Sequence, residues 1–216
     1  MNSYAQEKAD PVRKVDKADT VKLSFIPKGL RLGFDLMGAT RTVIDNGIKE
    51  LEFSADVEIH RYLINLEYGK FDATRKGNDN SIYTNNGSYL RGGIDINMLK
   101  KDTETNVLFL GVRYAKSTFD DQLQYGQTNA LFGDVSIDRS NTNISARWLE
   151  LTAGIKLHIT SNIWLGFTNR FKFAKKLDES TSLTPHDIPG YGKAGKDNYW
   201  GFNYQIMYRI PLRDKK

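Results

Sequence analysis

The stretch Leu30-Arg31-Leu32-Gly33-Phe34-Asp35-Leu36 decides the fold, because apolar and polar residues alternate along it. Successive side chains of a β-strand point to opposite faces, so this period of two predicts a strand with one apolar and one polar face. The same pattern returns near the end of the chain, in Trp200-Gly201-Phe202-Asn203-Tyr204-Gln205-Ile206. The sequence is therefore predicted to be all-β.

The alternation predicts eight strands, at residues 29–38, 49–59, 62–71, 88–99, 106–116, 146–158, 162–173 and 199–212. Each reaches the roughly 9–11 residues that a tilted strand needs to cross a membrane. The connections alternate between short ones (60–61, 100–105, 159–161) and long ones (39–48, 72–87, 117–145, 174–198). This is typical of an antiparallel up-and-down transmembrane β-barrel with short periplasmic turns and long extracellular loops.

Three regions follow from this reading. Residues 1–28 are charged and irregular and are predicted to be an N-terminal periplasmic extension, with either a short strand at 21–26 or a disordered leader. Residues 29–212 form the barrel, and residues 213–216 form a C-terminal tail. No signal peptide is visible at the polar start of the chain, so we expect a mature form after signal-peptide removal.

The alternation alone does not say which face is outside, because a soluble lipocalin-like barrel would have an apolar interior. Volume favours the inverse arrangement, since the lumen of an eight-stranded barrel is only just wide enough to be filled by side chains. The other face mixes glycines with nearly balanced charges, as a narrow polar lumen requires. That face contains Arg31, Gly33, Asp35, Glu50, Glu52, Asp56, Glu58, Glu67, Gly69, Arg91, Gly93, Asp95, Gly111, Arg113, Glu150, Gly154, Lys156, Gly166, Arg170, Lys172 and Arg209.

A subset of these charges is predicted to form a structural network that plugs the lumen. Buried ions are stable only when they are paired and hydrogen-bonded, and arginine can pair with a carboxylate through two hydrogen bonds. The predicted network residues are Arg31, Asp35, Glu52, Asp56, Arg91, Asp95, Arg113, Glu150, Arg170 and Arg209. We expect their role to be structural and not catalytic.

Aromatic residues near the predicted strand ends suggest girdles at the two membrane interfaces. These residues are Tyr62, Tyr89, Trp148, Trp164, Phe173, Trp200 and Tyr208.

The sequence contains no recognisable active site, and we predict no catalytic, cofactor-binding or metal-binding residues. Of the three histidines, His60 and His158 fall at the short-turn end and His186 falls in a long loop. The side chains of His186 and Asp187 are expected to diverge, because they are neighbours in an extended chain. The glycine-rich segment 190–196 is expected to be a flexible loop, and the chain lacks cysteine. The net charge of +5 is dispersed, so a nucleic-acid partner is not expected.

Several stretches resemble an uncharacterised family of small outer-membrane β-barrels of Bacteroidota, described as a domain of unknown function. The matching residues are 29–36, 88–95, 107–114, 188–193 and 201–204, within a likeness that covers about 29–212. The resemblance implies location in the bacterial outer membrane and no known catalytic residues.

We therefore expect a non-enzymatic barrel that is a structural or accessory subunit of a larger outer-membrane complex, with the barrel-assembly machinery as one candidate. Its partners would be outer-membrane lipid, lipopolysaccharide and other outer-membrane or periplasmic proteins. Two alternatives remain open from the sequence. One is a lipid-modifying outer-membrane enzyme or narrow channel, and the other is a soluble lipocalin-like ligand-binding barrel.

Overall fold

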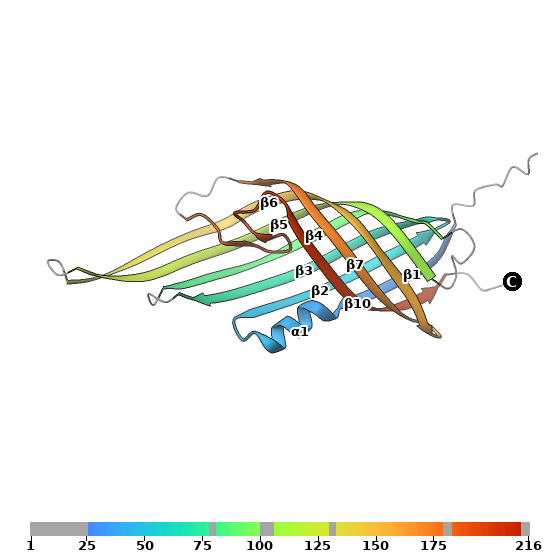
Figure 1. Cartoon of the computed structure of the whole chain (residues 1–216), viewed down its shortest axis with the longest axis horizontal. Coiled ribbons are helices and arrows are strands. Elements are labelled where there is room, and N and C mark those ends of the chain that lie inside the picture. The colour runs from blue at the N-terminus through green and yellow to red at the C-terminus, as the bar shows by residue number, and fades with distance from the viewer. Residues whose placement is uncertain (1–25, 78–80, 100–105, 130–132, 179–182, 213–216) are drawn as a thin grey trace, which may run out of the picture.

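A computed structural model describes residues 26–77, 81–99, 106–129, 133–178 and 183–212. The predicted extension and tail lie outside these residues except for 26–28. The described chain forms a closed antiparallel barrel of eight strands (Figure 1). Its strands are β1 (Pro27–Asp35), β2 (Ile48–Ile59), β3 (Tyr62–Lys76), β4 (Ile82–Asn97), β5 (Asn106–Asn129), β6 (Gly133–Thr160), β7 (Ile163–Leu177) and β10 (Tyr199–Pro211).

The barrel closes because its first and last strands pair with each other. Each strand pairs with its neighbours in sequence, and β1 pairs with β10 from Gly29↔Pro211 to Asp35↔Gln205. This is the predicted up-and-down order, so the fold class is confirmed. One end of the barrel carries the turn between β2 and β3 and the turn between β6 and β7, and we call it the short-turn end. The opposite end is called the mouth.

The first structural surprise is a helix, α1 (Leu36–Ile44), where the sequence predicted the end of a strand followed by a loop. The side chain of Asp35 accepts a hydrogen bond from the backbone N–H of Gly38 at 2.8 Å, which is the geometry of a helix N-cap. Leu36, Met37 and Ala39 then favour helix over turn. As a result β1 is the shortest strand of the barrel.

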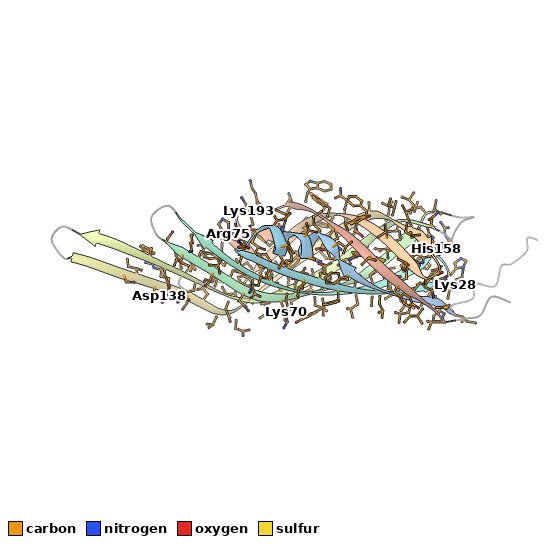
Figure 2. All side chains as sticks on the ribbon, turned by 90° about the horizontal axis from the view of Figure 1, so that it is seen from below. Lys28, Lys70, Arg75, Asp138, His158 and Lys193 are labelled. Carbon is orange, nitrogen blue, oxygen red and sulfur yellow. The ribbon has the colours of Figure 1, made fainter. Side chains whose placement is uncertain are left out.

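Two connections predicted to be long loops are instead continuations of the strands. β3 and β4 pair as far as Lys76↔Ile82, and β5 and β6 pair as far as Asn129↔Gly133. The β5–β6 hairpin therefore projects well beyond the rest of the barrel (Figure 1), and Figure 2 shows Asp138 on this projection. The predicted loop ends were wrong because the hydropathy alternation fades where buried inward positions are polar, as at Asn85 and Asp121, and where the hairpin tip meets water on both faces, while backbone pairing continues.

The polarity of the barrel is inverted relative to a soluble protein. Leu66, Leu110, Phe202 and other large apolar side chains on the outer face are about half exposed, whereas Arg31, Glu150 and Arg170 inside are at most 1% exposed. No described helix has the length and apolar character needed to cross a membrane.

Candidate functional site

Glu67 lies at the centre of the lumen, where three guanidinium groups converge on its carboxylate. Arg170 Nη2 lies 2.9 Å from Glu67 Oε2, and Arg91 Nη1 lies 3.3 Å from the same oxygen. Arg113 Nη1 donates to the other oxygen, Oε1. All four side chains are at most 3% exposed, so each charge depends on its partners for stabilisation.

Two further carboxylates join these arginines on the mouth side. Arg91 contacts Glu52 at 2.6 Å and Glu150 at 3.1 Å, and Arg170 contacts Glu150 at 3.0 Å. Aromatic donors complete the coordination. The hydroxyl of Tyr89 donates to Glu52 at 2.6 Å, and Nε1 of Trp148 donates to Glu150 at 2.7 Å.

A second cluster lies towards the short-turn end. Arg31 contacts Asp56 at 2.8 Å and Glu58 at 3.1 Å, and Lys156 contacts Asp56 at 2.7 Å. Large apolar side chains fill the space next to this cluster. They are Leu63, Val107, Phe109, Trp164 and Met207.

The glycines of the lumen wall make room for this filling. A Cβ added at Gly111 would lie 1.9 Å from Asp95 Oδ1, and one added at Gly69 would lie 2.2 Å from Cζ of Tyr89. At these positions a glycine faces a side chain from the neighbouring strand at a distance that leaves no room for a Cβ, so the interior is packed there and is not an open bore.

The structure brings together eight of the ten residues predicted for the lumen network: Arg31, Glu52, Asp56, Arg91, Asp95, Arg113, Glu150 and Arg170. Asp35 is buried but caps α1, and Arg209 is half-buried beside Gly29 without a carboxylate within 4.0 Å among the described residues. Glu67 and Lys156 belong to the network although the prediction did not include them. Both occupy the alternate positions of their strands that point to the polar face, and this alternation could have placed them in the predicted network.

The segment between β7 and β10 folds back into the mouth of the barrel. We call residues 183–198 the mouth loop; it contains β8 (Asp187–Ile188) and β9 (Gly192–Lys193). Arg75 contacts the Asp187 carboxylate at 2.8 Å, and Lys172 donates to the carbonyls of Gly190 and Tyr191 at 2.7 and 3.0 Å. Residues 190–196, expected to be a flexible loop, therefore lie against the barrel wall and are hydrogen-bonded to it in the structure.

Tyr191 anchors the mouth loop in an apolar cluster inside the barrel. Its side chain is 0% exposed, and its ring meets Trp148 edge-on with centroids 5.5 Å apart. Gly190 next to it has φ +76°, and a Cβ there would lie 2.5 Å from the ring of Tyr89. The cluster consists of Tyr89, Ala115, Phe119, Ile144, Ala146, Trp148, Ile188, Tyr191 and Ala194.

The docked loop should be sensitive to alkaline pH through Tyr191. Burial, and secondarily the charge of Asp197, raises the pKa of this phenol from 10.0 to about 12. The raised pKa stabilises docking fully below about pH 10, and this contribution is lost as pH rises to about 12. A difference titration of tyrosinate absorbance between the wild type and Tyr191→Phe should show one phenol ionising near pH 12. The pKa of Tyr83 is raised to a similar value, but Tyr83 is present in both proteins, so its absorbance cancels in the difference. Ionisation of Tyr191 near pH 10 would contradict docking of the loop.

The predicted aromatic girdle is partly wrong. Tyr89, Trp148 and Trp164 point inward and are at most 2% exposed, whereas Tyr62, Trp200 and Tyr208 face outward. Trp148 shares strand parity with Glu150 and hydrogen-bonds to it, which explains its orientation.

The histidines lie at opposite ends of the barrel. His158 is near the short-turn end, where its Nε2 lies 2.8 Å from the carbonyl oxygen of Ser161. His186 lies in the mouth loop, with Nδ1 3.1 Å from Asp187 Oδ2. The expectation that these neighbouring side chains diverge is wrong, because the turn into β8 brings them together. Within the described ranges there is no group of three or more side chains arranged to hold a metal ion.

The apolar outer face of the barrel, which we call the apolar belt, carries one polar side chain in the middle of β7. Asn169 is exposed between Phe167 and Phe171, and it pairs in register with Ala153 of β6 and Phe202 of β10. A shallow groove of about 500 Å³ passes over Asn169 and Ala153, lined also by Leu110, Leu151 and Trp200. A small residue and an amide thus lie side by side on this part of the apolar surface.

Comparison with known proteins gives a family but no activity. The model of DUF6048, a domain of unknown function, matches residues 1–215. No curated protein matches the chain. Among solved structures, Neisserial surface protein A is 11% identical with a TM-score of 0.39, covering 86% of this chain and 96% of its own. CarO of Acinetobacter baumannii is 12% identical with a TM-score of 0.40, covering 88% and 99%.

Proposed function

We propose that this chain, which belongs to the DUF6048 family, is a plugged, non-enzymatic β-barrel of the outer membrane that docks as an accessory subunit against another membrane protein. The inverted polarity supports the membrane location. Burying half-exposed leucine and phenylalanine side chains in hydrocarbon is favourable, whereas the same belt in water would be an aggregation surface. The short-turn end then faces the periplasm, and the mouth faces the lipopolysaccharide leaflet.

The filled lumen supports a structural role and not a conducting one. The Glu67 network occupies the middle of the barrel, and the mouth loop covers it from above. Ions would have to displace paired charges to pass. We expect no unitary conductance when the purified protein is inserted into planar lipid bilayers. Steady single-channel currents would refute the plugged barrel.

Asn169 carries the proposal of a membrane partner. An amide that faces hydrocarbon without a hydrogen-bond partner costs about 1–3 kcal/mol. Next to it, the exposed side chain of Ala153 leaves a groove between larger neighbours. Small and polar residues of this kind are enriched where transmembrane segments meet. A partner that packs into this groove would remove the cost by accepting or donating a hydrogen bond.

The projecting β5–β6 hairpin supplies a second contact surface outside the membrane. Beyond Ala146↔Leu177 the described pairing of β6 is with β5 alone, and β5 pairs with β4 only as far as Ile82↔Gln124, so the tip of the hairpin is two-stranded. A two-stranded hairpin is at best marginally stable by itself in water, and an uncovered strand edge is suited to pairing with another chain. The barrel-assembly machinery remains one candidate partner, and the hairpin suits a neighbour that extends above the membrane.

Affinity purification of the full-length protein in mild detergent tests the docking role. We expect a stoichiometric partner with the wild type, and its loss with Ala153→Phe, which fills the groove, and with Asn169→Leu. Ala55→Phe is the matched control, because Ala55 lies on the outer face of β2, where it pairs with Leu32 and Leu66. A wild-type monomer without partner would refute docking, as would a partner that tolerates both groove variants.

A further inference from the structure

The barrel wall has a gap in its strand pairing near the mouth. β1 ends at Asp35, and its pairs with β2 end at Phe34↔Phe53. Both β2 and β10 continue beyond these points, to Ile48 and Tyr199 respectively. In the described registers, neither continuation has β1 beside it. Helix α1 stands in this gap instead (Figure 1).

Polar contacts attach helix α1 to β2 through its C-terminal half and to β10 through its N-cap residue. Thr42 Oγ1 accepts a hydrogen bond from Glu50 N at 2.8 Å, and Arg41 contacts the Glu50 carboxylate at 2.8 Å. On the other side, the Asp35 carboxylate accepts a hydrogen bond from Tyr204 N at 3.1 Å. The remaining space between α1 and residues 199–203 of β10 forms a lateral slot.

A cavity of about 340 Å³ opens at this slot and reaches into the lumen. Trp200 and Phe202, which face outward and are 65% and 56% exposed, line it together with Gly201 and Asn203 on the inner face. Alternate residues of a strand point to opposite sides, and the cavity touches consecutive residues of β10 where β1 no longer pairs with it, so the cavity lies at this edge of β10, between the two faces of the wall. The cavity therefore connects the apolar belt with the charged interior.

The charges that line this cavity leave a cation in surplus. Three of its carboxylates are paired with arginine, namely Glu50 with Arg41, Glu52 with Arg91 and Asp187 with Arg75. The fourth, on Asp35, accepts two backbone N–H groups. The Lys172 side chain is 7% exposed; its ammonium donates to two backbone carbonyls and lies over the ring of Tyr199, with no carboxylate within 4.0 Å in the described part of the chain. One of its three N–H donors stays available.

Gly201 gives access to the Lys172 ammonium. A Cβ at Gly201 would lie 3.0 Å from Nζ of Lys172, so any side chain there would cover the ammonium from the slot. Lys193, an exposed residue of β9, lines the same cavity. Figure 2 shows Lys193 and Arg75 beside α1, at the end opposite Lys28 and His158.

We propose that this cavity binds the anionic phosphate headgroup of a membrane lipid, whose hydrocarbon chains leave through the slot along Trp200 and Phe202. The available volume suits a headgroup and not a whole lipid. Lys172 and Lys193 balance the phosphate charge, and the apolar belt takes the chains. This inference rests on the membrane location proposed above, since the lipid must arrive from the leaflet that surrounds α1.

Native mass spectrometry of the full-length protein tests the proposal. The protein is released from nanodiscs of phosphatidylcholine that contain a minor fraction of phosphatidic acid. We expect one phosphatidic acid to remain bound in preference to phosphatidylcholine. Lys172→Met and Gly201→Val should each reduce its retention about tenfold, the value of one charged hydrogen bond. Lys49→Met, which removes an exposed lysine of β2 outside the cavity, should leave retention unchanged.

A separate titration with inorganic phosphate distinguishes a lipid from a free anion. Phosphate that displaces the lipid at equal concentration would overturn the lipid assignment, because the chains would then contribute nothing. Equal retention of phosphatidic acid and phosphatidylcholine by the wild type would overturn the proposed site, whatever the variants show. Retention unaffected by Gly201→Val would overturn the slot as the entry. Heat-modifiable migration and vesicle insertion, measured in parallel, report on the barrel proposal independently of lipid binding.

Discussion

Glu67→Gln is expected to reduce the free energy of unfolding by about 3–5 kcal/mol, the usual cost of breaking a buried ion pair from one side. The neutral amide keeps the shape of the side chain but removes the one carboxylate that Arg91, Arg113 and Arg170 all contact. The three arginine side chains are at most 3% exposed, so water cannot replace the lost carboxylate. Urea unfolding of the protein in lipid vesicles, followed by tryptophan fluorescence, measures the change.

Asp178→Asn is the matched control for this substitution. Asp178 also pairs with an arginine, Arg147 at 3.5 Å, but both side chains are about half exposed. Water replaces such a contact easily, so we expect a change of about 0–1 kcal/mol. Equal effects of the two substitutions would mean that the lumen is hydrated and that Glu67 does not hold a dry network.

Tyr191→Ala is expected to accelerate hydrogen exchange in the mouth loop by about 100-fold or more, because truncating a fully buried aromatic side chain costs about 3–5 kcal/mol. The informative amides are Tyr191 N, bonded to Ile188 O at 3.0 Å, and Ala194 N, bonded to His186 O at 2.9 Å. The loss should stay local, since the strand pairing of the barrel does not pass through this loop. Exchange followed by mass spectrometry on peptides from 186–196 measures the opening.

Tyr204→Ala controls for the removal of a tyrosine ring. Tyr204 lies on the outer face of β10 and is 41% exposed. We expect normal exchange in the mouth loop for this variant. Fast exchange of the loop in the wild type, or no acceleration in Tyr191→Ala, would show that the loop does not plug the barrel.

Much of the barrel could be read from alternation alone. The period of two in 30–36 and 200–206 assigns each residue to a face, and the lengths of the short turns make neighbouring strands antiparallel. The alternation along the strand also predicts side-chain orientations that the girdle prediction did not take into account. Trp148 has the parity of Glu150, so its inward orientation was available from the sequence.

The boundaries of elements were harder to predict, because they depend on the solvent that surrounds them. Buried inward positions of these extensions are polar, as at Asp121 and Asn141, and the hairpin tip meets water on both sides, so β5 and β6 continue through residues whose hydropathy does not alternate. β1 ends at Asp35 because the N-cap hydrogen bond from Gly38 N–H to the Asp35 side chain favours a helix where strand pairing would otherwise continue. The alternation of apolar and polar residues alone does not predict where the strand gives way to the helix.

Residue order alone specifies the two faces of the wall, the eight strands of the barrel and the near balance of charges inside. Which charges meet depends on the folded barrel, because Glu67 of β3 contacts arginines of β4, β5 and β7 that come together only when the barrel closes. Closure also leaves the gap that α1 occupies and brings the mouth loop over the lumen. The physical reason is that alternation is a property of neighbours along the chain, whereas pairing of buried charges depends on residues that only the closed ring brings within reach.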